Sequence, residues 1–162
     1  MKLFHGTNII IEKPRILIPN RALDFGAGFY LTSDFAQAAR WAKLVVLRAD
    51  SGLPLIHEYC FDMDNLNKLK TKRFESASRE WLDFVCDHRL DIYEGDDFDL
   101  VIGPVANDRT MRVIQAYMSA TDRDLYAPVA LNDIRADKLS DQYVFRSERA
   151  LNVLRLLDVR EA

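Results

Sequence analysis

Alternation of apolar and polar positions predicts several short strands along the chain. The clearest run is Pro54 to Asp62, which places one set of side chains on one face and a second set on the other: His57, Tyr59 and Phe61 against Ile56, Glu58 and Cys60. Further strands are predicted at Lys2 to Thr7, around Asp99 to Gly103 and at Tyr143 to Phe145. The Gly-punctuated segment Phe25 to Thr32 predicts a tight turn that runs into a short strand.

Apolar residues at helical spacing predict four helices. The first begins at Asp34, which forms a capping box with Gln37, and continues to about Leu47. The others are expected at Ser78 to Leu90, at Ala106 to Ala120, and from an N-cap at Ser147 through Ala150, Leu151, Leu154 and Leu157. Because strands and helices are interspersed without a regular βαβ order, the pattern favours an α+β fold. The absence of a repeat or a linker-like stretch predicts a single domain over residues 1–162.

Composition narrows the class of protein. The 162 residues include 22 Lys and Arg against 25 Asp and Glu, a formal net charge of −3, which argues against a general coat for DNA or RNA. Cys60 and Cys86 are too few for a zinc knuckle and indicate buried thiols in a reducing compartment. The sequence shows no signal peptide and no membrane span, so we expect a cytoplasmic protein with no metal.

The first candidate site is His5-Gly6-Thr7, at the end of the first predicted strand. Glycine lets a ligand approach the backbone closely, and the flanking His and Thr offer side-chain hydrogen bonds. A His at the end of a strand equally fits a purely structural role, so this segment alone leaves both readings open.

The second candidate is Asp24 to Thr32, where Gly26 and Gly28 permit a close turn among aromatic residues. A flat aromatic surface such as that of Tyr30 can stack on a heteroaromatic ring. The alternative is that Phe25, Phe29 and Tyr30 belong to the core. The glycine spacing does not match the GxGxxG dinucleotide fingerprint.

Three polar segments remain. Ser140 to Phe145 is a polar triplet that opens an apolar strand, and Gly103 to Thr110 places a turn ahead of a helix with Asn107 or Asp108 as its N-cap. The acidic run Glu94 to Asp99 lacks the ligand pattern of a calcium loop and indicates a solvated turn. None of the common hydrolase, metalloprotease or P-loop motifs is present.

Taken together, the order of these segments resembles the ADP-ribosyltransferases of the diphtheria-toxin and poly(ADP-ribose) polymerase branch. Three segments carry this resemblance, His5-Gly6-Thr7, Asp24 to Thr32, and Ser140 to Phe145, and Gly103 to Thr110 adds a fourth match to a narrower family. The chain is most similar to a bacterial family of small ADP-ribosyltransferase-like proteins, over His5 to about Leu154. The resemblance implies two small β-sheets, flanked by helices, with an NAD cleft between them.

The resemblance also implies roles for residues. His5 would hydrogen-bond the adenosine ribose, Gly6 backbone groups would hold the nicotinamide carboxamide, and Tyr30 would stack on the nicotinamide ring. Gln142 stands where the branch has a Glu and would hydrogen-bond the nicotinamide ribose, without a charge. Thr7, Gly28 and Asn107 complete the expected NAD-binding set, with His5, Tyr30 and Gln142 as the catalytic residues.

Because Gln142 lacks the carboxylate that supports polymer elongation, the resemblance implies transfer of a single ADP-ribose, a glycosyl transfer from NAD. The expected protein is a toxin of a bacterial toxin–antitoxin pair, acting on an unknown protein or nucleic acid and held by a small antitoxin. The alternative is a catalytically weak or inactive module of the same fold that binds NAD or a partner.

Overall fold

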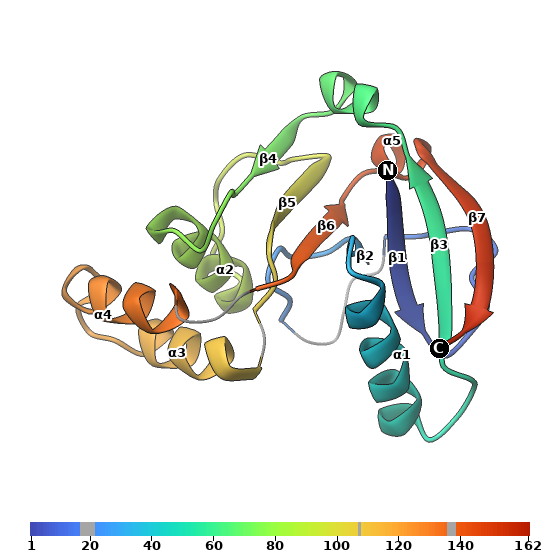
Figure 1. The fold of residues 1–162 in the computed structure, drawn as a ribbon. Coiled ribbons are helices and arrows are strands. Elements are labelled where there is room, and N and C mark those ends of the chain that lie inside the picture. Colours follow the sequence, from blue (N-terminus) through green and yellow to red (C-terminus); the bar gives the residue numbers. More distant parts are fainter. Residues whose placement is uncertain (17–21, 107, 136–138) are drawn as a thin grey trace.

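The computed structural model describes residues 1–16, 22–106, 108–135 and 139–162, with the backbone alone at 108, 109 and 135. Its strands form two sheets (Figure 1). The first sheet is antiparallel and joins β1 (Lys2–Thr7), β3 (Leu55–Phe61) and β7 (Leu154–Glu161), with β3 in the centre. The second has the order β2 (Phe29–Leu31), β6 (Asp141–Phe145), β5 (Leu100–Pro104) and β4 (Thr71–Arg73), with β4 parallel to β5. The α+β prediction is confirmed.

Helices cover the sheets unequally. In Figure 1, α1 (Phe35–Ala49) runs beside β1, whereas α2 (Arg79–Leu90), α3 (Asp108–Met118) and α4 (Arg123–Arg135) gather on the far side of the second sheet. Two short helical segments complete the chain, η1 (Met63–Lys68) and α5 (Glu148–Leu151). The sequence pattern gave no expectation for β4, η1 or α4.

Two large apolar clusters hold most of the described elements together, and a small third one, of Phe4, Ala38 and Ile56, joins α1 to the first sheet. One large cluster lies between the sheets, because alternate residues of β2 and β6 face β1 and β3; its buried members include Leu3, Phe29, Leu31, Tyr59, Phe61, Tyr143 and Phe145. The other lies between the opposite face of the second sheet and the helices, and its buried members include Phe25, Trp81, Val101, Tyr117 and Val144. The second sheet is therefore apolar on both faces.

The start of α1 is fixed by the predicted N-cap. Asp34 accepts a hydrogen bond from Gln37 N at 3.1 Å. The other half of the predicted capping box differs, because Asp34 N donates to Thr32 Oγ1 and Thr32 Oγ1 donates to Gln37 Oε1. Thr32 therefore takes the place that Gln37 has in a reciprocal box, which ties the helix to the end of β2.

The prediction for the last helix is wrong beyond its first turn. Ser147 is the N-cap, as expected, and accepts from Ala150 N at 3.1 Å, but α5 ends at Leu151. From Leu154 the chain is a strand, because it pairs with β3 along the whole register from Leu154–Phe61 to Glu161–Leu55. This long-range ladder outweighs the helical spacing of Leu151 and Leu154.

Candidate functional site

His5 lies half-buried on β1, with its ring stacked on Phe29 at a centroid distance of 4.5 Å. Its Nδ1 is 2.7 Å from the carbonyl oxygen of Tyr30. A carbonyl only accepts, so Nδ1 carries the proton and Nε2 of the neutral ring is an acceptor. Burial lowers the pKa of His5 to about 4, which keeps the ring neutral at pH 7. His5 therefore offers a fixed ring with a defined acceptor atom.

Gly6 faces α1. A Cβ at this position would lie far inside van der Waals contact with the backbone oxygen of Ala38, so the absence of a side chain lets helix and strand backbones meet. The sequence analysis expected a ligand to approach the backbone closely at Gly6. On this face of β1, it is α1 that makes this close approach. Thr7, which follows, is buried at the end of the strand.

Tyr30 is half-buried on β2 with its hydroxyl bound to the preceding turn. The hydroxyl donates to Gly26 O at 2.7 Å and accepts from Phe25 N at 3.2 Å. Gly26 has a φ of 71°, a left-handed conformation that suits glycine. Burial raises the pKa of the Tyr30 hydroxyl, which stays protonated and can donate. Phe25 and Phe29 are core residues, as the structural alternative predicted.

Gly28 packs against β6. A Cβ here would overlap the Val144 side chain and approach Phe145 O. The pairing of β2 with β6 therefore requires a residue without a side chain at this position. Asn107, also expected to bind NAD, lies outside the described residues.

Gln142 is only 4% exposed, on the helix-covered face of β6 that it shares with Val144. Its Nε2 donates to Pro104 O at 3.2 Å and, at 3.4 Å, to Oδ2 of Asp24. Asp24 is itself buried, accepts from Arg89 Nε at 2.8 Å and from Ala106 N at 3.2 Å, and so sits at the centre of a polar network. A neutral amide and a buried ion pair satisfy one another here.

The role of Asp24 was missed because its partners are distant in sequence. The separation from Gln142 is 118 residues and that from Arg89 is 65, so no local spacing signals the network. The only hint is that an acidic residue directly precedes the buried Phe25.

The three predicted catalytic residues lie on three neighbouring strands. β1 meets β2 through the isolated bridge between Phe4 and Thr32, and β2 pairs with β6. His5 contacts the backbone of Tyr30, whose side chain shares its sheet face with Gln142 because Tyr30 pairs with Val144. The structure thus places the three residues on neighbouring strands at one corner of the fold. The His5 ring stacks on Phe29, which faces the cluster between the sheets, whereas the side chains of Tyr30 and Gln142 lie on the opposite, helix-covered face of the second sheet.

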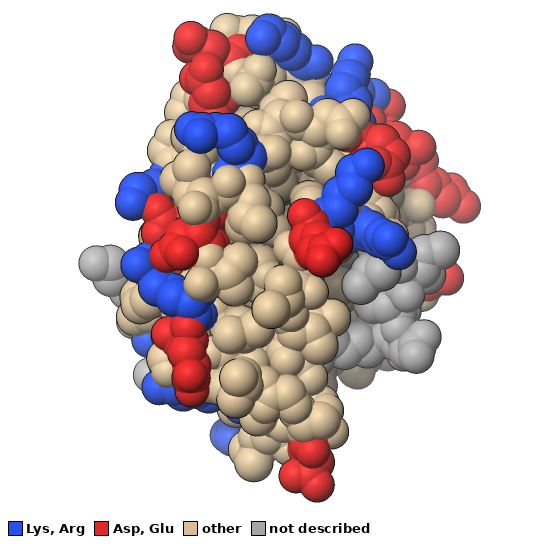
Figure 2. All heavy atoms as spheres, turned by 90° about the vertical axis from the view of Figure 1, so that its right-hand side faces the viewer, with Lys and Arg blue, Asp and Glu red and all other residues tan. Residues whose placement is uncertain are grey.

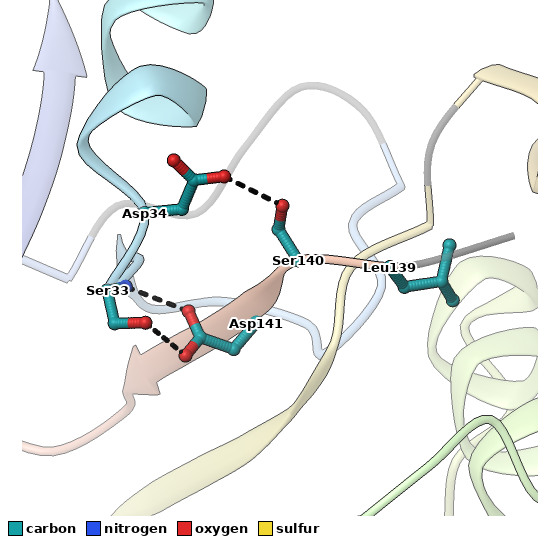
Figure 3. Close-up of a pocket in the computed structure, with 5 residues that line it drawn as sticks. All are labelled: Ser33, Asp34, Leu139, Ser140 and Asp141. Atoms are coloured by element: carbon teal, nitrogen blue, oxygen red, sulfur yellow. Dashed lines mark hydrogen bonds between the residues drawn. The ribbon is translucent and has the colours of Figure 1, made fainter.

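A pocket of ≈ 510 Å³ opens beside this corner, where β2 leads into α1 and β6 begins (Figure 3). It is lined by Ser33, Asp34, Leu139, Ser140 and Asp141. Figure 3 shows the side chains of Ser33 and Asp141 pointing toward one another, as do those of Asp34 and Ser140. Ser33 Oγ donates to Asp141 Oδ2 at 2.5 Å, and Ser140 Oγ donates to Asp34 Oδ2 at 3.0 Å.

Three of the pocket residues had been named from the sequence, Ser140 and Asp141 in the polar triplet and Asp34 as the N-cap, but not as members of a site. Asp141 precedes Gln142, and strand alternation places the two side chains on opposite faces of β6. The hydrogen bonds at the start of α1 also act on the pocket. The bond from Gln37 N lowers the pKa of Asp34, and the bond from Ser140 has a smaller effect in the same direction. Asp34 is therefore ionised at neutral pH.

Charge on the face opposite the helices is mixed. Figure 2 shows Lys and Arg interspersed with Asp and Glu across the upper part and down the left edge, around a broad area of other residues in the lower centre, with no continuous basic tract among the residues that this view colours. Buried Glu58 is paired on this sheet with Lys2 at 2.5 Å and Arg160 at 2.7 Å. Within the described ranges, no three His, Cys, Asp or Glu side chains group to hold a metal ion. Nor does any described helix have the length and apolarity to span a membrane.

Comparison with known proteins identifies a family. The family model described as "Protein of unknown function (DUF3990)" matches residues 1–156. The chain belongs to the DUF3990 family. The matched part of this DUF3990 chain contains His5, Tyr30, Gln142 and every residue that lines the pocket. No curated protein and no solved structure matches the chain.

Proposed function

We propose that this protein is an NAD+-dependent mono-ADP-ribosyltransferase of the diphtheria-toxin and poly(ADP-ribose) polymerase type. In this proposal it acts in the cytoplasm as the toxin of a bacterial toxin–antitoxin pair, on a protein or nucleic-acid acceptor. The observation that supports the proposal is that His5, Tyr30 and Gln142 lie on adjoining strands, with His5 Nδ1 2.7 Å from Tyr30 O. The finer fold assignment, two sheets that form an NAD cleft, belongs to the same proposal.

His5 is suited to a ribose hydroxyl. Its Nδ1–H is engaged by Tyr30 O, and its low pKa leaves Nε2 unprotonated, so the ring accepts a hydrogen bond from a hydroxyl donor. A sugar hydroxyl donates one such bond. The stacking on Phe29 holds the ring in place and reduces the entropy lost when substrate binds.

Gly6 is suited to bind a carboxamide through its backbone groups at the edge of β1, because the face of β1 at this residue is covered by α1. Phe4 N donates to Thr32 O, and Thr32 N donates to Phe4 O, so Phe4 directs both backbone groups toward β2. Residues two apart on a strand direct these groups to the same edge, which gives Gly6 the same orientation. On this edge of β1, which is the edge away from β3, no described strand pairs beyond that bridge. The carboxamide of nicotinamide, with its N–H and C=O, complements such an edge.

Tyr30 would supply the stacking surface. Both hydrogen bonds of its hydroxyl go to the Phe25–Gly26 turn, so the ring plane is fixed before a ligand arrives. Stacking of an aromatic ring on a heteroaromatic ligand typically contributes about 1–3 kcal/mol. Thr7, Gly28 and Asn107 remain predicted members of the NAD-binding set.

The reaction breaks the C1′–N glycosidic bond of NAD+, and its electron pair leaves with neutral nicotinamide. The ribose then carries an oxocarbenium-like charge until an acceptor nucleophile captures it. Gln142 would orient the nicotinamide ribose through its amide, which is neutral and provides less electrostatic stabilisation than a carboxylate. A single transfer rather than polymerisation follows from that difference.

A second function is favoured by the network around Gln142. Its amide already donates to Pro104 O and Asp24, and it carries no charge to stabilise the sugar cation. A module that binds NAD+ or a protein partner without turnover would keep the corner and lack catalysis. A small antitoxin is the partner proposed for either function.

Release of nicotinamide from NAD+ by the purified chain distinguishes the two functions. We expect release by the wild type, loss of release in Gln142→Ala, and equal or faster release in Gln142→Glu. Thermal melting of each variant controls for folding, since Gln142 is buried. Wild-type rates in Gln142→Ala would remove this residue from the site. Binding of NAD+ without release by either wild type or Gln142→Glu would establish the binding module instead.

A further inference from the structure

Ser33 presents an exposed hydroxyl that is hydrogen-bonded to a carboxylate. It lies two residues after the end of β2, and its Oγ donates to Asp141 Oδ2 at 2.5 Å. Its backbone N–H donates to the other oxygen, Oδ1, at 2.8 Å. Two contacts from one residue therefore fix the carboxylate relative to the hydroxyl (Figure 3).

This pairing is the arrangement that activates a serine. A hydroxyl is a weak nucleophile until a positioned base takes its proton, and a base must lie within hydrogen-bond reach of that proton. Asp141 meets this requirement. The other acid of the pocket, Asp34, is occupied elsewhere, because its oxygens accept from Gln37 N and Ser140 Oγ.

The pair stands next to the proposed donor site. Ser33 is three residues after Tyr30, and the intervening Thr32 pairs with Phe4, the neighbour of His5. Thr32 Oγ1, whose one proton is shared between Gln37 Oε1 and Asp141 Oδ1, lies 3.0 Å from the latter, which links the carboxylate to this corner. The pocket of ≈ 510 Å³ falls within the usual size of small-molecule sites and leaves room beside Ser33 for a sugar.

We propose that Ser33 is an acceptor of ADP-ribose on this protein itself, with Asp141 as the base. The inference rests on the proposed transferase function. The C1′–N bond of NAD+ breaks and its electron pair leaves on the nicotinamide nitrogen. A lone pair of Ser33 Oγ forms the new C1′–O bond, and the hydroxyl proton passes to the Asp141 carboxylate and then to solvent. The products are nicotinamide and O-linked ADP-ribosyl-Ser33.

The test is mass spectrometry of the full chain after incubation with NAD+, with nicotinamide release followed in the same samples. We expect one ADP-ribose on the peptide that contains Ser33, none there in Ser33→Ala, and modification of Ser33→Thr, which keeps a hydroxyl. Asp141→Asn keeps an acceptor oxygen but loses the base, so we expect modification at least about 100-fold slower. Ser51→Ala is the matched control, because Ser51 is also exposed and should be unmodified.

The outcomes separate this inference from the proposed function. Nicotinamide release without an adduct on Ser33 overturns the acceptor role and leaves the transferase intact, whereas absence of release overturns both. An adduct that neutral hydroxylamine removes would be an ester on Asp34 or Asp141 and would also overturn it. Loss of nicotinamide release in Ser33→Ala, with unchanged melting, would place Ser33 in the donor site and contradict its role as acceptor. If Asp141→Asn does not fold, the location of the adduct and the Ser33→Thr variant still decide the question.

Discussion

The chemistry of the candidate corner depends on which atoms of each residue are already engaged. His5 keeps Nε2 as an acceptor because Tyr30 O takes its Nδ1 proton, and Tyr30 keeps its ring fixed because the turn takes its hydroxyl. Gln142, in contrast, has its amide nitrogen engaged by Pro104 O and Asp24. The sequence pointed to the three residues through their order, but hydrogen bonds across 25 to 118 residues cannot be read from local spacing.

Two substitutions at Tyr30 separate its hydroxyl from its ring. Tyr30→Phe leaves the ring but deprives Phe25 N of its acceptor, so we expect a loss of about 1–2 kcal/mol in the free energy of unfolding and unchanged NAD+ affinity. Tyr30→Ala should weaken NAD+ binding by about 1–3 kcal/mol. Denaturant unfolding and calorimetry measure the two effects. Unchanged affinity in a folded Tyr30→Ala protein would assign the ring to the core alone.

Stability should fall on mild acidification because His5 resists protonation in the folded state. Burial lowers its folded pKa to about 4, below the usual 6.5, so between these values the unfolded chain binds a proton that the folded protein does not. Stability is therefore lost as the pH falls from about 6.5 to about 4. His57 and His88, whose pKa values burial also lowers, act in the same direction.

Replacement of the imidazole ring isolates the contribution of His5 to this pH dependence of stability. In His5→Gln the pH dependence of the free energy of unfolding should be shallower between pH 6.5 and 4, since each pKa unit corresponds to about 1.4 kcal/mol. Urea unfolding at a series of pH values provides the measurement. An identical pH profile in the variant would show that His5 does not titrate in this manner.

At the scale of elements, long-range strand pairing determines the secondary structure where the local apolar pattern predicts another element. The strand at Pro54 to Asp62 was predictable because its side chains alternate between the two faces of β3, with His57 on one face and Glu58 on the other. The last helix was not, because Leu151 and Leu154 have helical spacing while β3 supplies a partner for the chain from Leu154 onward. Short β4 has only three residues, too few for alternation to register.

The contact between α1 and β1 gives a test at this scale. Gly6→Ala would drive a methyl group into the backbone of Ala38, and two backbones must separate to admit it, so we expect a loss of at least about 1–3 kcal/mol. The matched control is Gly95→Ala, where the methyl group would meet only the movable Tyr93 side chain. Denaturant unfolding compares the variants. Equal stability of the two would show that α1 does not lie directly on β1.

At the scale of the whole molecule, the two sheets place the corner where they meet. The cluster between them buries Leu3, Tyr59 and Phe145, so β1 and β6 are held on either side of β2. The α+β class followed from the irregular order of elements, whereas the division of strands between sheets did not, because β1 forms a ladder with β3, which in turn pairs with β7, and not with its successor β2. The DUF3990 match, over residues 1–156, includes strands of both sheets and ends within β7.

The central claim is that the corner of His5 and Tyr30 binds NAD+, which the transferase and a module that binds NAD+ without turnover have in common. Calorimetric titration of NAD+ into the full chain tests it most directly, beside His5→Ala with its melting temperature as a control for folding. We predict saturable binding at one site in the wild type, and clearly weaker binding in a folded His5→Ala protein because the acceptor Nε2 is gone. Absence of binding heat at millimolar NAD+ across two temperatures, or equal affinity of the two proteins, would contradict the account.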